Sequence, residues 1–168
     1  MSVTGAPIQG IIHELVSRHV AITSTLPVFE LFAPGKAPLQ RRVLEAMSQE
    51  ARLQYLEIRV HFDLPHRDPK TGEVEPRPWA QAFAQEKEFE RAFVQAGGFL
   101  LAGEDPTGIG GDLAGFGDQR ELELLVESGF TPLEAIHIAT YNGAQYLGNL
   151  DHIGTIAAGK QADLVVIK

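Results

Sequence analysis

The sequence contains no cysteine. This absence excludes a disulfide framework, a zinc–thiolate site and a catalytic thiol. Basic residues are also scarce, because 14 Lys and Arg stand against 22 Asp and Glu, which leaves a net charge of −8. Without a cluster of Lys and Arg the chain is poorly suited to neutralise a phosphate backbone, so we expect no nucleic-acid partner.

Long apolar runs are missing as well. None approaches the ~20 residues that cross a bilayer, so we expect no membrane partner. The first ten residues, MSVTGAPIQG, lack the basic start and the apolar stretch of a secretory signal, and we therefore expect a cytoplasmic protein. The 168 residues, 44% of them hydrophobic, have the composition of an ordinary globular domain.

Several motifs of nucleotide and acyl-transfer sites are absent. Residues 103–108 have the glycine spacing of a phosphate loop, but Ile109-Gly110 stands where that loop needs Lys followed by Ser or Thr. Arg120 occupies the place of the third glycine in a dinucleotide fingerprint that would begin at Gly115. No nucleophile elbow is present. A small α/β nucleotide-binding domain is therefore only the third interpretation of the chain.

The six histidines form neither His-x-His nor His-Glu-x-x-His. Each is expected to be a packed or surface side chain. One group, His61, Asp63, His66 and Asp68, has residue types that bind metals. The surrounding stretch, residues 61–78, holds four prolines without apolar periodicity, so a solvated, exposed loop is the better interpretation.

Apolar spacing and β-branched runs predict alternating helices and strands. Ser48 is expected to break the second helix by capping a new segment, and Asp118-x-x-Glu121 and Thr131-Pro-Leu-Glu134 are expected to start later ones. The predicted helices span residues 7–18, 39–60, 79–96, 118–129 and 131–142, and the predicted strands span 20–29 (closed by Pro27), 99–103, 152–156 and 162–168. Such an order favours an α/β fold with parallel strands.

Two adjacent acids, Glu104 and Asp105, follow the apolar strand Phe99-Leu-Leu-Ala-Gly103. Parallel α/β folds present their chemistry at the carboxyl ends of the strands, so these acids are candidate functional residues. The alternative is turn formation, since Asp before Pro often starts a turn through its own side chain. The residue types alone leave both interpretations open.

Three stretches together resemble a known family: FLLAGEDPTG, ELELLVESGFTPLEAIHIATYNGAQYLG and IGTIAAGKQADLVVIK. They are similar to the C-terminal part of the amidohydrolase superfamily of metal-dependent hydrolases, most of all to its imidazolonepropionase and prolidase-like branch. The segment VAITSTLPVFE, residues 20–30, resembles the seventh barrel strand of that family. The likeness covers most of the chain and is weakest over residues 33–80.

The resemblance implies the last strands and helices of a (β/α)8 TIM-type barrel, followed by part of a small β-sandwich. Residues 1–150 would be the C-terminal portion of the barrel, and residues 151–168 would begin the sandwich. A full barrel takes about 250 residues, so the barrel would be incomplete here. We therefore expect the chain to need the remainder of the barrel or another subunit. Uncovered sheet edges and apolar helix faces also predict self-association.

The resemblance further implies a divalent metal, zinc above all, with Asp105 as the ligand from the eighth strand. Asp105 would also take a proton from the attacking water and pass it to the leaving nitrogen. Glu104 stands where the family usually has threonine. Glu104, Thr107, Gly108, Gly110 and Gly111 would border the substrate pocket. The family's other metal ligands have no counterpart in this sequence.

By this likeness the chain is a fragment of an amidohydrolase that uses a metal-activated water to hydrolyse C–N bonds, in non-peptide or dipeptide amides. Its substrate would be a small molecule, and the chain alone would be inactive. Two alternatives stay open. One is a catalytically inactive barrel remnant that acts in binding or assembly, and the other is the nucleotide-binding domain named above.

Overall fold

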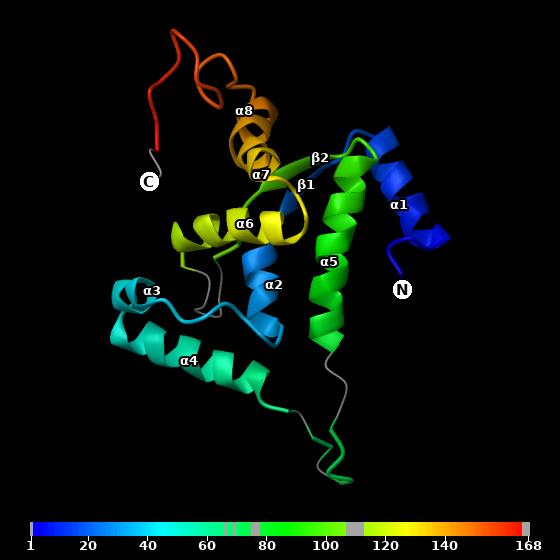
Figure 1. Ribbon diagram of the computed structural model, residues 1–168, viewed down its shortest axis with the longest axis vertical. Coiled ribbons are helices and arrows are strands. Elements are labelled where there is room, and N and C mark those ends of the chain that lie inside the picture. The colour runs from blue at the N-terminus through cyan, green and yellow to red at the C-terminus, as the bar shows by residue number, and fades with distance from the viewer. Residues whose placement is uncertain (1, 66, 69, 75–77, 107–112, 166–168) are drawn as a thin grey trace.

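A computed structural model of the chain describes residues 2–65, 67–68, 70–74, 78–106 and 113–165. The fold is α/β, with a two-stranded sheet among helices (Figure 1). The elements in chain order are α1 (Ala6–Ser17), β1 (Ala21–Ser24), α2 (Leu26–Phe32), α3 (Arg41–Ala46), α4 (Gln49–Asp63), α5 (Pro78–Gln95), β2 (Phe99–Ala102), α6 (Phe116–Glu127), α7 (Pro132–His137), the π-helical turn η1 (Ile138–Asn142) and α8 (Gly143–Tyr146). No helix of these described residues is long and apolar enough to cross a membrane.

The two strands pair in parallel, as the sequence predicts. Ala21 lies opposite Phe99 and Ser24 lies opposite Ala102. One more hydrogen bond, from Gly103 N to Ser24 O at 2.9 Å, extends the pairing past the strand ends. A Cβ at Gly103 would lie 2.9 Å from Thr23 Cγ2, so a larger residue would require the Thr23 side chain to shift. The carboxyl ends of both strands therefore meet at one edge of the sheet.

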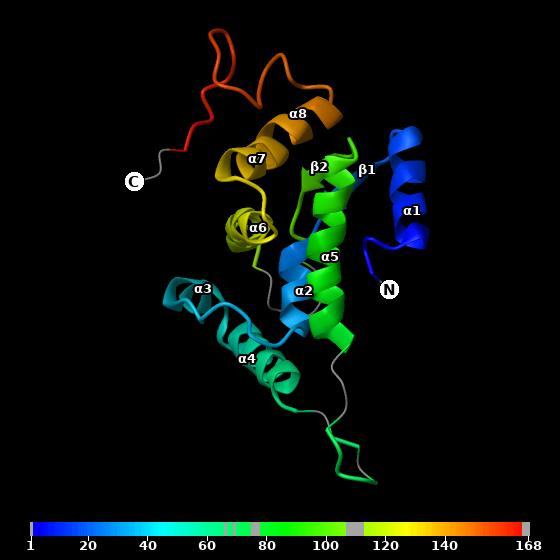
Figure 2. The ribbon, with the colours of Figure 1, turned by 45° about the vertical axis from the view of Figure 1, so that its right-hand side comes forward.

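The sheet lies between two layers of helices. Figure 2 shows α1 and α5 on one side of the strands and α6 and α7 on the other. The buried core between the layers consists of Ile12, Leu26, Phe93, Leu100, Leu124, Leu125, Phe130, Ala135 and Ile138. Asn142 of η1 donates from Nδ2 to Leu100 O at 2.8 Å, which satisfies a buried carbonyl of β2.

A second, smaller cluster holds α3 and α4 against α2, with Leu31, Met47 and Tyr55 at its centre. The helix break expected near Ser48 is confirmed. Ser48 Oγ accepts a hydrogen bond from Ala51 N at 3.2 Å and so caps the start of α4. Both views place α3 and α4 beside α2 and away from α1 (Figures 1 and 2).

The strand predicted over residues 20–29 was too long. β1 ends at Ser24 and α2 begins at Leu26, with Pro27 in the first turn of the helix. Proline suits this position because the first helical N–H groups have no partner within the helix. The apolar residues after Ser24 therefore line a helix face, since Leu26, Pro27 and Leu31 are buried.

The two strands predicted after residue 151 are also wrong for the described residues. Residues 152–165 form turns and extended chain without a strand. A single backbone pair, Gln161 N to His152 O at 2.8 Å, joins the two arms of this segment. Ile156 is 90% exposed and Val165 is 88% exposed. A strand needs a partner for its backbone groups, and residues 152–165 form no strand pairing with any described segment.

Candidate functional site

Asp105 lies where the sequence predicts it, beyond the carboxyl end of β2. Its backbone φ is +49°, a left-handed conformation that aspartate adopts more readily than most residues. Its side chain is exposed. Residues 103–106 form no hydrogen-bonded turn, and Asp105 lies beyond the edge of the sheet.

Glu104 connects the end of β2 to the start of α6. Its Oε1 atom accepts a hydrogen bond from Gly115 N at 3.3 Å. Its Oε2 atom is buried and has no hydrogen-bond partner among the described residues. Thr107, Gly108, Gly110 and Gly111, which were expected to border the substrate pocket, lie outside the described residues.

No group of three or more His, Cys, Asp or Glu side chains gathers into a metal site within the described residues. In the group His61, Asp63, His66 and Asp68, Asp63 pairs with Lys36 Nζ at 2.9 Å, and Asp68 Oδ1 accepts from two backbone N–H groups of its own turn. His66 lies outside the described residues. The described residues thus offer carboxylates at the strand end but do not complete a metal site.

The structure reveals a buried acidic side chain, Glu90, that the sequence interpretation missed. Glu90 of α5 is 1% exposed, and its Oε2 accepts a hydrogen bond from Ser24 Oγ at 2.9 Å. Burial raises the pKa of Glu90 to about 8; the Ser24 hydrogen bond opposes this rise, and the carboxylates of Glu121 and Glu86 add to it. Burial also raises the pKa of Glu86. Glu90 is therefore protonated at neutral pH.

The sequence does contain a signal for the buried Glu90. Glu86 and Glu90 lie three and seven residues after Phe83 and so share the buried stripe that ends at Phe93. An acid on an apolar stripe indicates a buried carboxyl with a specific partner. That partner, Ser24, is 66 positions away in the sequence, so the spacing alone does not identify it.

Glu121 has a different role from the one expected. The predicted helix start at Asp118-x-x-Glu121 was wrong, because α6 begins at Phe116 after Gly115, whose φ is +85°. Glu121 therefore lies in the second turn of α6, 1% exposed, and accepts a hydrogen bond from Leu26 N at 3.1 Å. Leu26 N is one of the N–H groups at the start of α2, where a carboxylate is favoured.

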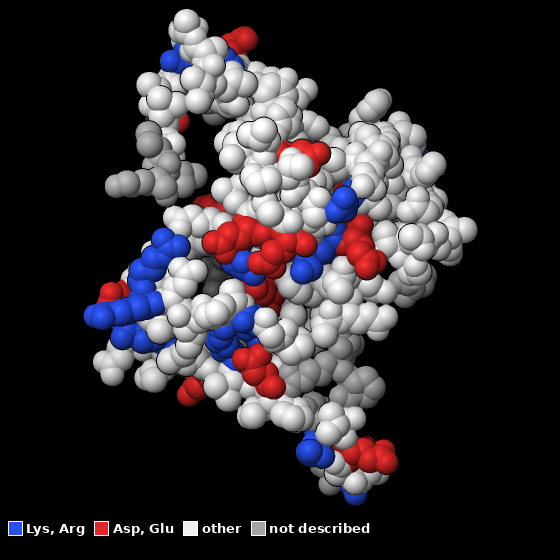
Figure 3. Space-filling model, viewed as in Figure 1, with Lys and Arg blue, Asp and Glu red and all other residues white. Residues whose placement is uncertain are grey.

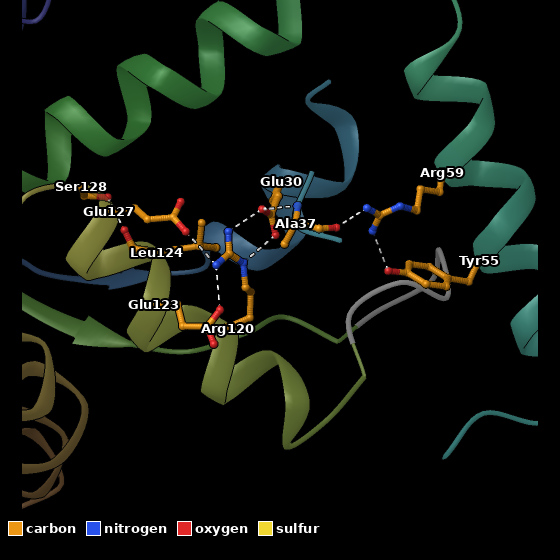
Figure 4. A network of polar contacts seen from close by, with 9 residues as sticks. All are labelled: Glu30, Ala37, Tyr55, Arg59, Arg120, Glu123, Leu124, Glu127 and Ser128. Atoms are coloured by element: carbon orange, nitrogen blue, oxygen red, sulfur yellow. Dashed lines mark hydrogen bonds and ion pairs between the residues drawn. The ribbon is translucent and has the colours of Figure 1, made fainter. Parts of the chain in front are cut away.

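A charged network links α2 to α6 (Figure 4). Arg120 donates two hydrogen bonds to Glu30, at 2.7 and 3.0 Å, and contacts Glu123 and Glu127 at 2.8 Å each. Burial by itself lowers the pKa of Arg120, but the hydrogen bonds to Glu30, Glu127 and Glu123 outweigh it and raise that pKa above its ordinary value. Arg120 is thus a fixed cation that joins two helices.

Comparison with known proteins finds a family match in the C-terminal part of the chain. The amidohydrolase family matches residues 100–168, which run from within β2 to the end of the chain. No solved structure matches the chain.

Three relatives are named adenine deaminases. Adenine deaminase 3 of Rhizobium meliloti is 33% identical over 89 residues, 52% of this chain and 15% of that protein. Adenine deaminase 1 of Carboxydothermus hydrogenoformans is 49% identical over 43 residues, 26% of this chain and 7% of that protein. Adenine deaminase of Listeria innocua is 45% identical over 47 residues, 28% of this chain and 8% of that protein. The chain therefore spans a small part of the length of each.

These matches define the class of protein. Residues 100–168 match the amidohydrolase family, and the three relatives named above carry the name of a hydrolase that acts on C–N bonds. The resemblance seen in the sequence is thereby confirmed at the level of the family. The imidazolonepropionase and prolidase-like branch stays a prediction.

Proposed function

We propose that this chain is the C-terminal part of a hydrolase that cleaves C–N bonds, in which Asp105 is the catalytic carboxylate of the last barrel strand. The observation that carries the proposal is the position of Asp105. It lies three residues past the end of β2, a strand of a parallel pair, and inside the segment that matches the amidohydrolase family. Carboxyl ends of parallel strands are the usual place of catalytic groups in α/β barrels.

In this proposal β1 and β2 are the seventh and eighth strands of a (β/α)8 barrel, and residues 151–168 lead into a β-sandwich. Direct parallel pairing of β1 with β2, with α2 to α5 in the connection between them, supports neighbouring barrel strands. The other strands would come from the remainder of the barrel or another subunit.

A divalent cation, zinc above all, would lower the pKa of water and polarise the bond under attack when bound. The described residues do not by themselves fit a complete cation site, because they bring together no group of three ligands. We therefore assign to this chain only the carboxylate of Asp105, which would accept a proton from water and donate it to the leaving nitrogen. Glu104, with one buried carboxylate oxygen, would shape the neighbouring pocket.

Adenine is the first small-molecule substrate to test, because the three relatives carry the name adenine deaminase. Removal of its amino group would be hydrolysis of a C–N bond. Non-peptide and dipeptide amides form the second substrate group, since the resemblance of the sequence points to them.

The experiment compares this chain with the longest product of its gene. We expect the 168-residue chain alone to hold no stoichiometric zinc and to release no ammonia from adenine. The longest product should hold zinc and release ammonia or amine. Asp105→Asn in that product should lower kcat by roughly 10²–10⁴-fold, the usual share of a general acid–base group. An unchanged kcat in this variant would contradict the role of Asp105.

Asp118→Asn is the matched control, since Asp118 is an exposed acid in the first turn of α6. It should leave both zinc content and kcat unchanged. A loss of activity in both variants would point to a general charge effect and not to a catalytic Asp105.

A second candidate function is a barrel remnant without catalysis that acts in binding or assembly. The incomplete ligand set of the described residues favours it. The same measurements separate the two functions. A longest product without zinc and without hydrolysis of adenine or amides supports the remnant.

A further inference from the structure

A hollow with basic walls lies between α2, the α3–α4 segment and the start of α6. Its cavity has a volume of about 80 Å³, and a single bound water needs only ~10–15 Å³ of such space. Leu113 and Phe116 contribute apolar surface. The cationic side chains that line it are Lys36, Arg42, Arg59 and Arg120.

Two of these four cations pair with no carboxylate among the described residues. Arg59 donates from Nη1 to Tyr55 Oη at 3.0 Å and from Nη2 to Ala37 O (Figure 4). Arg42 donates from Nε to Gln40 Oε1 at 2.7 Å, and its guanidinium lies 5.5 Å from the centre of the Phe116 ring. Neutral partners hold both guanidinium groups in place without cancelling their charge.

The acidic and basic side chains of the hollow lie at opposite ends of it. The carboxylates on its wall, Glu30 and Glu123, both bind Arg120 at the α6 end. Figure 3 shows acidic side chains along α6, basic side chains over α3 and the adjoining part of α4, and a depression between them. At the basic end the side chain of Lys36 is only 2% exposed and pairs with Asp63 at 2.9 Å, so Arg42 and Arg59 supply the charge there that no described carboxylate cancels.

We infer that this hollow binds the carboxylate or phosphate group of a small molecule through Arg42 and Arg59. Planar guanidinium groups suit both anions because they offer paired donors in a fixed fork. Neighbouring residues link the hollow to the segment after β2, since Glu104 accepts from Gly115 N and the next residue, Phe116, lines the hollow. This inference concerns binding by the chain itself and does not require the proposed hydrolase activity.

The test is a titration of the full 168-residue chain, followed by ¹H–¹⁵N NMR at pH 7 and constant ionic strength. Inorganic phosphate and succinate are the two probes, and sodium chloride is the reference salt. We expect saturable shifts confined to residues 36–43, 55–59 and 113–120. Saturation by only one probe supports the site and identifies its anion. Shifts that match those of sodium chloride, or that do not saturate, overturn the inference.

Substitutions distinguish binding at a defined site from attraction by the net charge of the surface. Arg42→Gln and Arg59→Gln should each weaken binding by roughly tenfold, because each removes a charged hydrogen-bond donor. Arg59→Lys keeps the positive charge but removes the paired donors of the guanidinium. It should therefore weaken anion binding less than Arg59→Gln does. Arg41→Gln is the matched control, as Arg41 is the neighbour of Arg42, is highly exposed and pairs with Glu45.

Binding should stay within twofold of the wild-type value in the Arg41→Gln variant. Far-UV circular dichroism of every variant should match that of the wild type, which shows that each one folds. An equal loss in the Arg41 and Arg42 variants, or no loss in the Arg42 and Arg59 variants, would reject the site.

Discussion

At the scale of single residues, Glu90 is the most unusual group in the described part of the chain. It is a carboxyl with 1% exposure that faces Ser24 of β1, Glu121 of α6 and Glu86 of its own helix. Its neutral form is favoured because water is excluded and two further carboxyls lie near. Its pKa is about 8 in the folded chain against an ordinary 4.5.

This rise makes stability depend on pH. An acid with a higher pKa in the folded state keeps its proton there after the unfolded chain has released its own. The free energy of unfolding should therefore fall as pH rises from about 4.5 to about 8 and level off above that. The fall should amount to at most about 5 kcal/mol. Urea unfolding at intervals between pH 5 and pH 9 measures it.

Glu90→Gln should flatten this pH dependence, since the amide resembles the neutral carboxyl in size and polarity. At pH 8 the variant should be more stable than the wild type, while at pH 5 the two should differ little. Glu88→Gln is the matched control, because Glu88 is exposed on the same helix and should keep the wild-type slope. Equal slopes in all three proteins would mean that Glu90 ionises freely in the folded chain.

At the scale of elements, Arg120 joins α2 to α6 through its two hydrogen bonds to Glu30. Arg120→Met should lower the free energy of unfolding by about 3 kcal/mol, because it leaves Glu30 largely buried without a counter-charge. Thermal unfolding at pH 7 measures this loss. Arg41→Met removes an exposed pair on α3 and should cost less than about 1 kcal/mol. Similar losses in both variants would show that the Arg120 network contributes nothing beyond a surface pair.

The capping box of α7 is a second feature at this scale. Thr131 Oγ1 accepts from Glu134 N at 3.3 Å, and Glu134 Oε2 accepts from Thr131 N at 2.7 Å. Thr131→Ala should cost about 1 kcal/mol of stability, the usual loss for a helix cap. Thr140→Ala, in the following helical turn, removes a hydroxyl that donates to Ile136 O one turn earlier and should change stability by less than about 0.5 kcal/mol. Denaturant midpoints of the two variants give the comparison, and equal midpoints would refute the role of the cap.

The sequence patterns predicted individual helices and strands better than any other part of the fold. The helix expected over residues 7–18 and the cap at Ser48 were confirmed because both depend on neighbours within a few positions. The region after Thr25 was predicted as strand because its apolar run fits a strand and a buried helix equally well. The structure forms a helix there, and Glu121 from a distant segment accepts its first N–H group.

At the scale of the whole molecule, the two-stranded sheet and the exposed apolar side chains predict self-association. Leu133 and Leu147 are 80% and 74% exposed, and Ile156 and Val165 are more exposed still. Apolar surface of this kind favours contact between copies unless another chain segment covers it. Sedimentation velocity between about 5 and 200 μM should show a mean mass that rises with concentration. A constant monomer mass over this range would contradict the prediction.

The sequence by itself determined the likeness of residues 100–168 to the amidohydrolase family, the apolar spacing of the helices and the place of Asp105 after a strand. Each of these depends on residues close together in the chain. Only the tertiary structure decided the rest. It paired Ser24 with Glu90, Leu26 with Glu121 and Glu30 with Arg120, and it enclosed the Arg42–Arg59 hollow between three helical segments. These contacts join residues tens of positions apart, so their formation depends on packing and on the exclusion of water rather than on local pattern.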